Sequence, residues 1–275
     1  GWAHTCVLRE DDKVLCWGSG LSGRLGYGNT NTIGDNEDPA SAGSLPLPGG
    51  IIDLVAGGSH TCALFEGGTV KCWGAGSSGQ LGYGNTDDIG DNESLAGLVD
   101  VPVGAKVVEL AANLVHTCAR LESGDIKCWG DNAGGRLGYD PGDAKIGDDE
   151  VPADMPALDL GGPALTVTAG QDFTCVRLVG DLAKCWGLND FGQLGQGNTE
   201  PVVSDLANLP PIDVGGLVGI IDITAGWRHV CVRTSGNAGK CWGDGGSFQL
   251  GNGLIEIDGD NLGEPAKSLA IKFPW

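Results

Sequence analysis

The hydrophobic and polar positions along the chain predict short β-strands that recur in one order. Residues 51–60, IIDLVAGGSH, form an apolar run that closes on glycine, as a buried strand does. The stretches 60–64 (HTCAL) and 69–74 (TVKCWG) flank the turn 65–68 (FEGG) and predict a hairpin. Glycine-rich loops follow, and then a short stretch such as 44–50, SLPLPGG. The pattern indicates about four short strands in each repeat and no convincing helical period.

This pattern occurs five times in the 275-residue chain, at nearly constant spacing. Every repeat has two cysteines separated by nine residues, and the second cysteine opens the tripeptide Cys-Trp-Gly. The pairs are Cys6/Cys16, Cys62/Cys72, Cys118/Cys128, Cys175/Cys185 and Cys231/Cys241. Four-stranded units with a period of about 40–60 residues are typical of propeller blades. We predict an all-β fold, a five-bladed β-propeller forming one domain over 1–275, with repeats at approximately 1–50, 51–106, 107–163, 164–219 and 220–275.

The cysteine spacing predicts how each hairpin closes. Pairing Cys62 with Cys72 leaves 66–68 (Glu-Gly-Gly) as a three-residue loop, whose last position favours a left-handed residue. Gly68 occupies that position in the second repeat and Asp181 in the fourth, and both residue types tolerate it. The two cysteines then face each other, with α-carbons about 4.5–5.5 Å apart, within the range of a disulfide. We therefore predict five hairpin disulfides.

Ten cysteines in spatial pairs indicate an oxidising compartment, either extracellular, at the cell surface or periplasmic. The alternative is a set of reduced cysteines that act as small core residues. Zinc is disfavoured, because Cys-x-x-Cys spacing is absent and Phe173 replaces the histidine that precedes the cysteine in the other repeats.

Residues 56–85, AGGSHTCALFEGGTVKCWGAGSSGQLGYGN, resemble the repeat of the regulator of chromosome condensation family. In that repeat Gly-x-x-His-Ser/Thr, a hairpin, Trp-Gly and Gly-Gln-Leu-Gly follow one another, and this chain has five copies. The resemblance implies a β-propeller, although founding members have seven blades. The paired cysteines are similar to those of a secreted, bacterial-like branch. Because the family fold serves an exchange factor, a photoreceptor and an inhibitor, it implies no single function.

The two chain ends predict how the ring closes. Read head to tail, 271–275 (IKFPW) and 1–6 (GWAHTC) match the register of 221–231, IDITAGWRHVC. We therefore expect Ile271–Trp275 to pair beside Gly1–Cys6 and to remove the open edge of the first blade. Two alternatives stay open: the same strand completes a blade of a neighbouring copy, or the repeats are an arc of a longer array.

Composition narrows the classes of partner. The chain has 36 acidic and 16 basic residues, a net charge of −20, which repels nucleic acids and anionic membranes. No apolar run reaches the ~18–20 residues of a membrane helix. We expect no nucleic acid and no membrane insertion, and instead a protein partner or self-association. Met155 is the only methionine, which indicates a mature or excised product.

Three acidic loops, 28–39, 84–94 and 140–152, are candidate cation sites. Their carboxylates are Asp35, Glu37 and Asp38 in the first, Asp91 and Glu93 in the second, and Asp148, Asp149 and Glu150 in the third. Flexible loops with oxygen ligands suit weak calcium binding. Alternatively, they are solvated turns whose glycine and aspartate serve backbone geometry. Calcium is the only cofactor that the sequence suggests.

Tryptophan supplies a second candidate surface. Five of the eight tryptophans belong to Cys-Trp-Gly and are expected to pack between blades. The others, Trp2, Trp227 and Trp275, would come together in a closed ring, where they predict an aromatic binding patch. Alternatively, Trp2 and Trp275 brace the closure.

Catalytic chemistry has little support. The histidines His4, His60, His116 and His229 recur at one repeat position, which favours a strand-end hydrogen bond over a general base. No nucleophile–base arrangement stands out, so we name no catalytic residue. We predict a non-enzymatic extracellular or surface-exposed propeller that binds protein, mediates adhesion or self-assembles. The alternatives are an exchange-factor-like regulator, by analogy with the family, and a secreted inhibitor-type binding protein.

Overall fold

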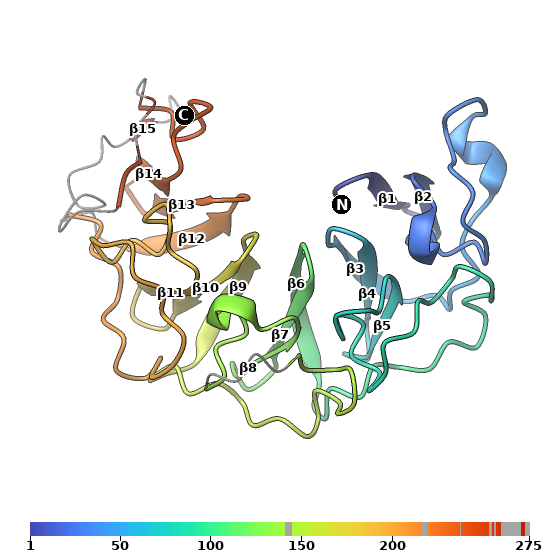
Figure 1. Cartoon of the computed structure of the whole chain (residues 1–275), viewed down its shortest axis with the longest axis horizontal. Helices are drawn as coiled ribbons and strands as arrows, with labels where there is room; N and C mark the ends of the chain where they lie inside the picture. The colour runs from blue at the N-terminus through green and yellow to red at the C-terminus, as the bar shows by residue number, and fades with distance from the viewer. Residues whose placement is uncertain are drawn as a thin grey trace. The chain divides into compact units, whose positions relative to one another are not determined.

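The computed structural model describes residues 1–140, 145–215, 219–236, 238–252, 255, 257–259 and 271–272. The described residues form five small antiparallel sheets, one in each repeat, and three single-turn 3-10 helices, so the all-β prediction is confirmed (Figure 1). None of the described helices is long and apolar enough to cross a membrane. The chain divides into two compact units, and the prediction of a single domain stays a prediction.

The first unit consists of Gly1–Glu122, Lys127–Asp131 and Ala144–Ala157. Its sheets are β1 (His4–Leu8) with β2 (Val14–Gly18), β3 (Ile51–Ala56) with β4 (His60–Phe65) and β5 (Val70–Gly74), and β6 (Val107–Asn113) with β7 (His116–Leu121) and β8 (Ile126–Gly130). The first sheet therefore has one strand fewer than the next two. Its 3-10 helices are η1 (Leu21–Gly23) and η2 (Pro39–Ala42).

The second unit consists of Ser123–Ile126, Asn132–Asp143 and Leu158–Trp275. Its sheets are β9 (Ala164–Ala169) with β10 (Phe173–Leu178) and β11 (Leu182–Gly187), and β12 (Ile220–Ala225) with β13 (His229–Thr234), β14 (Ala238–Gly243) and β15 (Ile271–Lys272). The helix η3 (Ala133–Gly135) also belongs to this unit.

The predicted hairpin register is confirmed. Cys62 lies opposite Cys72 and Leu64 opposite Val70, and Gly68 closes the loop with a left-handed φ of 79°. Asp181 takes the same role in the fourth repeat with a φ of 62°. The corresponding residue of the fifth hairpin, Asn237, lies outside the described residues.

The predicted role of the chain end differs from the pairing observed. Ile271 pairs with Gly239 and Lys272 with Ala238, so these two residues extend the fifth sheet along β14 instead of covering β1. They correspond to the outer segments of other repeats, such as Leu45, whose amide donates to the carbonyl of Val14 in β2. Residues 273–275 lie outside the described residues, and closure of the ring stays a prediction.

The Cys-Trp-Gly tryptophans fill the cores, as predicted, with one exception. Trp73, Trp129, Trp186 and Trp242 are fully buried. Trp17 is only half-buried, and its sheet lacks the inner strand that β3 provides in the second repeat. One isoleucine of each acidic loop also packs inward: Ile33 and Ile146 are buried, and Ile89 is half-buried.

Candidate binding surfaces

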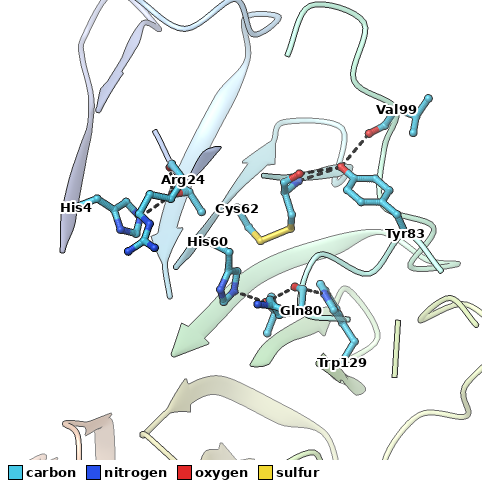
Figure 2. Close-up of a disulfide and its surroundings, with 11 residues drawn as sticks. His4, Arg24, His60, Cys62, Gln80, Tyr83, Val99 and Trp129 are labelled. Carbon is cyan, nitrogen blue, oxygen red and sulfur yellow. Dashed lines mark hydrogen bonds between the residues drawn. A yellow bond between two sulfur atoms is a disulfide. The ribbon is translucent and has the colours of Figure 1, made fainter. Parts of the chain in front are cut away.

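The ten cysteines form the five disulfides predicted from the sequence. The pairs are Cys6–Cys16, Cys62–Cys72, Cys118–Cys128, Cys175–Cys185 and Cys231–Cys241, with α-carbons 4.0 to 4.1 Å apart. None of the cysteines is free. Tyr83 ties the second pair to the following loop, because its hydroxyl lies 3.1 Å from the Cys72 amide and 3.2 Å from the Val99 carbonyl (Figure 2).

A repeated set of hydrogen bonds joins consecutive blades, and we call it the blade lock. It comprises the histidine before the first cysteine of one repeat, the threonine and the Cys-Trp-Gly tryptophan of the next repeat, and one backbone carbonyl. Between the second and third blades, Nε2 of His60 lies 2.9 Å from Oγ1 of Thr117. That hydroxyl donates to the Gln80 carbonyl at 3.0 Å, and the Trp129 indole donates to the same oxygen at 3.0 Å (Figure 2). One carbonyl thus anchors two side chains of the next blade.

The same lock recurs along the chain. Between the first and second blades, His4 Nε2 lies 2.9 Å from Thr61 Oγ1, and the Thr61 hydroxyl and the Trp73 indole donate to the Arg24 carbonyl at 3.2 and 3.1 Å. In the second unit, Thr174 and Trp186 donate to the Arg136 carbonyl at 2.9 and 3.1 Å. The histidines are therefore structural in these positions, as the sequence indicated.

The lock of the fourth and fifth blades replaces a polar pair by an apolar pair. Phe173 stands at the histidine position and Val230 at the threonine position, and both are fully buried in one cluster. Trp242 still donates to the corresponding carbonyl, that of Gln193, at 3.0 Å. The histidine and the threonine have changed together, which indicates that the two side chains depend on each other.

The lock fixes the protonation of its histidines. Because the Thr117 hydroxyl donates its one hydrogen to the Gln80 carbonyl, its oxygen must accept a hydrogen bond from a protonated Nε2 of His60. Nδ1 of His60 is then the unprotonated nitrogen, and it has no partner among the described residues. Burial lowers the pKa of His60 to about 3 and that of His4 to about 4. Neutral, hydrogen-bonded rings of this kind are poor candidates for acid–base catalysis near pH 7.

Buried lysines have a structural role that the sequence analysis missed. Nζ of Lys184 donates to the carbonyls of Leu160, Leu206 and Ala207 at 2.9, 2.8 and 3.0 Å. Lys127 binds three carbonyls in the same way in the first unit. Desolvation lowers the pKa of both amines. The signal was visible in the sequence, since a lysine precedes Cys-Trp-Gly in every repeat except the first.

The first two acidic loops use their glutamates to hold the backbone. Glu37 accepts hydrogen bonds from the amides of Gly34 and Asn36 at 2.9 and 3.4 Å. Glu93 repeats this arrangement with Gly90 and Asn92 at 2.8 and 3.2 Å. Asp38 caps η2 by accepting from Ala40, and the exposed Asp35 and the half-buried Asp91 flank the glutamates. These contacts favour the solvated-turn interpretation for both loops.

The third acidic loop brings its three carboxylates together. Oxygens of Asp148, Asp149 and Glu150 lie within 4.8 Å of one another. Burial, and then a hydrogen bond with Asp149, raises the pKa of Glu150. Calcium at these loops stays a prediction.

The exposed tryptophans lie in different units. Trp2 in the first unit is 68% exposed and Trp227 in the second is 50% exposed. Trp275 lies outside the described residues, so the patch of three tryptophans stays a prediction.

Trp227 borders an open hollow on the fifth blade. The hollow has a volume of about 380 Å³ and is lined by Trp227, Arg228, His229, Asp244, Ser247 and Gln249. Two contacts position Arg228: its guanidinium lies 4.6 Å from the centre of the Phe191 ring, and its Nε donates to Gln171 at 3.1 Å. The hollow thus combines an exposed aromatic ring with ordered polar groups.

Comparison with known families matches most of the repeats. Models of the regulator of chromosome condensation (RCC1) repeat match residues 1–24, 51–80, 107–136 and 185–233. The mitochondrial RCC1 domain-containing protein RUG3 of Arabidopsis thaliana is 32% identical over 254 residues, covering 90% of this chain and 53% of that protein. The ultraviolet-B receptor UVR8 of the same plant is 31% identical over 265 residues, covering 93% and 54%. The chain therefore spans about half the length of these two relatives.

Solved structures agree on the fold. Human WBSCR16 superposes with a TM-score of 0.74 at 18% identity, covering 99% of this chain and 65% of that one. Prp20p of Saccharomyces cerevisiae gives 0.66 at 23% identity, covering 100% and 63%. At these identities the likeness concerns the fold, which is the predicted propeller of repeated blades. Together, the repeats, the blade architecture and the relatives show that the chain belongs to the family of proteins built from regulator of chromosome condensation (RCC1) repeats.

Proposed function

We propose that the chain is a non-enzymatic propeller that binds another protein, and that it works in an oxidising compartment, extracellular, at the cell surface or periplasmic. The observation that carries the binding role is the hollow beside Trp227. Binding hot spots are enriched in tryptophan and arginine, and here the half-exposed Trp227 lies next to Arg228, which stacks on Phe191. The net charge of −20 favours a basic protein partner over nucleic acid.

A non-enzymatic role is favoured because the repeated polar groups serve the structure. Hydrogen bonds between neighbouring repeats engage four of these groups: His4, His60, Lys127 and Lys184. An acid–base catalytic site needs titratable groups that can exchange protons near neutral pH. His4 and His60 are poor candidates, because they are buried and their pKa values are low. The human relative HERC2 is named an E3 ubiquitin-protein ligase, but the chain covers only 5% of it.

Relatives support a role in protein recognition. The structure of yeast Prp20p is described with binding to Gsp1p and histones, and another structure shows the yeast protein with Kap60. We do not extend nucleotide exchange to this chain, because that chemistry is cytosolic. The five hairpin disulfides instead suit an oxidising compartment.

The binding role is tested by affinity capture from the extracellular fraction of the source organism. The bait is the folded chain, compared with Trp227→Ala and with Val179→Thr as a matched control. Val179 is also an exposed apolar residue, at 55%, but lies in a hairpin loop. We expect one partner that the control retains and Trp227→Ala loses. Equal capture by all three baits would show that the hollow is not the binding site.

A further inference from the structure

Phe248 lies at a position where the four earlier repeats have glycine. Counted from Cys-Trp-Gly, the equivalents are Gly23, Gly79, Gly135 and Gly192. All five residues have a left-handed backbone, with φ between 60° for Phe248 and 77° for Gly135. Glycine adopts this conformation freely, whereas a bulky side chain is strained in it. The Phe248 side chain is 61% exposed, so burial of the ring does little to offset that strain.

In the first three repeats this glycine lies against the backbone of the following repeat, and we call this the loop contact. A Cβ on Gly79 would lie 2.7 Å from the carbonyl oxygen of Ile146, in the third repeat. A Cβ on Gly135 would lie 2.6 Å from Cα of Val203, in the fourth repeat. Each of these contacts lies within one compact unit. The following repeat therefore packs so closely that a side chain does not fit at this position.

The loop that carries Phe248 otherwise has the same backbone as its equivalents. The Phe248 amide donates to the Gly245 carbonyl at 2.9 Å, and the Phe248 carbonyl accepts from the Gly251 amide at 3.1 Å. The equivalent bonds of Gly192 are 2.9 Å each. The backbone thus keeps the form that makes the loop contact elsewhere, and the side chain is what differs.

We propose that Phe248 is a stop residue: it prevents a further repeat of this family from packing on the fifth blade as the other blades pack on one another. The Cβ of Phe248 already occupies the space that the backbone of a following loop would need, and the ring occupies more. A second copy of the chain is excluded from the same contact for the same reason. This holds whatever precedes Gly1 or follows Trp275, because the obstacle is one side chain of one loop. Natural proteins accept a cost in stability for devices of this kind.

The stop residue also bears on the hollow beside Trp227. Ser247 and Gln249, on either side of Phe248, line that hollow of about 380 Å³. A partner that reaches the hollow across this loop must therefore have a fold other than an RCC1-type repeat. Phe248 would act as a stop whether or not the hollow binds a protein.

The test extends the full chain by a sixth repeat. A copy of residues 50–106, the second repeat with the glycine before it, is fused after Trp275 in the wild-type chain and in the Phe248→Gly variant. A repeat that does not dock cannot bury its apolar face and is digested by a broad-specificity protease, whereas a docked repeat resists. Intact mass measurement follows the added repeat over time. We expect the wild-type chain to lose it and the Phe248→Gly chain to keep it about tenfold longer.

Two results of this digestion would overturn the inference. One is an added repeat that both chains lose at the same rate, and the other is an added repeat that both chains keep. In either case Phe248 makes no difference to the packing of a further repeat. The hollow as a binding site is tested separately, by protein capture with Trp227→Ala.

The same ring placed inside an existing loop contact gives an independent measurement. Gly79→Phe introduces it between the second and third blades, and Ser78→Phe is the control, because Phe191 occupies that position in the fourth repeat. The Gly84 amide reports on this contact, since it donates to the Gly147 carbonyl of the third repeat at 3.1 Å. Its hydrogen exchange should be about tenfold faster in Gly79→Phe than in Ser78→Phe. Equal rates would contradict the stop role, and if Gly79→Phe does not fold, the extended chains decide.

Discussion

Thr117→Val removes one hydroxyl from a lock in which every distance is known. The hydroxyl accepts from His60 Nε2 at 2.9 Å and donates to the Gln80 carbonyl at 3.0 Å. Valine has nearly the same shape, so packing should change little. The Gln80 carbonyl keeps Trp129 as a donor at 3.0 Å, but the fully buried His60 ring keeps no hydrogen bond.

The free-energy cost of Thr117→Val follows from the hydrogen bonds that are lost. Leaving a buried donor unsatisfied costs about 1–3 kcal/mol, and the lost bond to Gln80 adds about 1 kcal/mol. We therefore expect Thr117→Val to lower the free energy of unfolding by about 2–4 kcal/mol. His60→Phe should cost about 1–2 kcal/mol, because the Thr117 hydroxyl still donates to Gln80.

The double variant is the informative one. His60→Phe with Thr117→Val rebuilds the apolar pair that Phe173 and Val230 form naturally. Gly57 leaves room for the ring at position 60, as Gly170 does for Phe173. The double variant should therefore be more stable than Thr117→Val alone, with a coupling energy of about 2 kcal/mol.

Urea unfolding monitored by tryptophan fluorescence measures all four proteins. The converse change gives the control: Phe173→His should destabilise, because Val230 cannot accept a hydrogen bond, and adding Val230→Thr should recover most of the loss. If the double variants lose as much stability as the two single changes added together, the histidine and threonine are not coupled, and the lock is wrong.

Three further outcomes follow from the structure. Burial lowers the pKa of His4 from 6.5 to about 4 and that of His60 to about 3, so both rings bind protons more tightly in the unfolded chain. The free energy of unfolding should therefore be highest above pH 6.5 and fall as the pH drops toward the folded-state pKa values, by about 1.4 kcal/mol for each pH unit and ring. Urea midpoints between pH 7 and pH 4 measure this, and a midpoint independent of pH would contradict it. Replacing Cys62 and Cys72 together by alanine, which buries no new polar group, should cost about 2–3 kcal/mol, and a cost well above this in urea unfolding would contradict the entropic account. Gly57→Ala would drive a Cβ into the His60 ring and should lower the melting temperature strongly, whereas Gly67→Ala points into open space and should not; equal melting temperatures would refute the packing argument.

Local features of the blade could be predicted because their causes are local. Nine residues between the cysteines and a glycine before Thr69 fix the register of the second hairpin, whose partners the structure confirms. Burial of the Cys-Trp-Gly tryptophans followed from strand alternation for four of the five, and Trp17, which is half-buried, departs from it.

The blade lock could not be predicted because its members lie 57 residues apart, as His60 and Thr117 do, and meet only after blades pack. A signal existed: the fourth repeat loses its histidine and the fifth loses its threonine, which is the pairing expected for neighbours. The role of Glu37 as a turn acceptor was also missed, because carboxylates in loops serve cations and backbone amides equally well in sequence.

The most direct test of the disulfide-stapled propeller is alkylation of the native protein, taken from its source and denatured without reductant, followed by intact mass measurement. The structure pairs all ten cysteines, so we expect no alkylated thiol, and ten after reduction. Ten alkylated thiols before reduction would contradict both the staples and the oxidising compartment inferred from them.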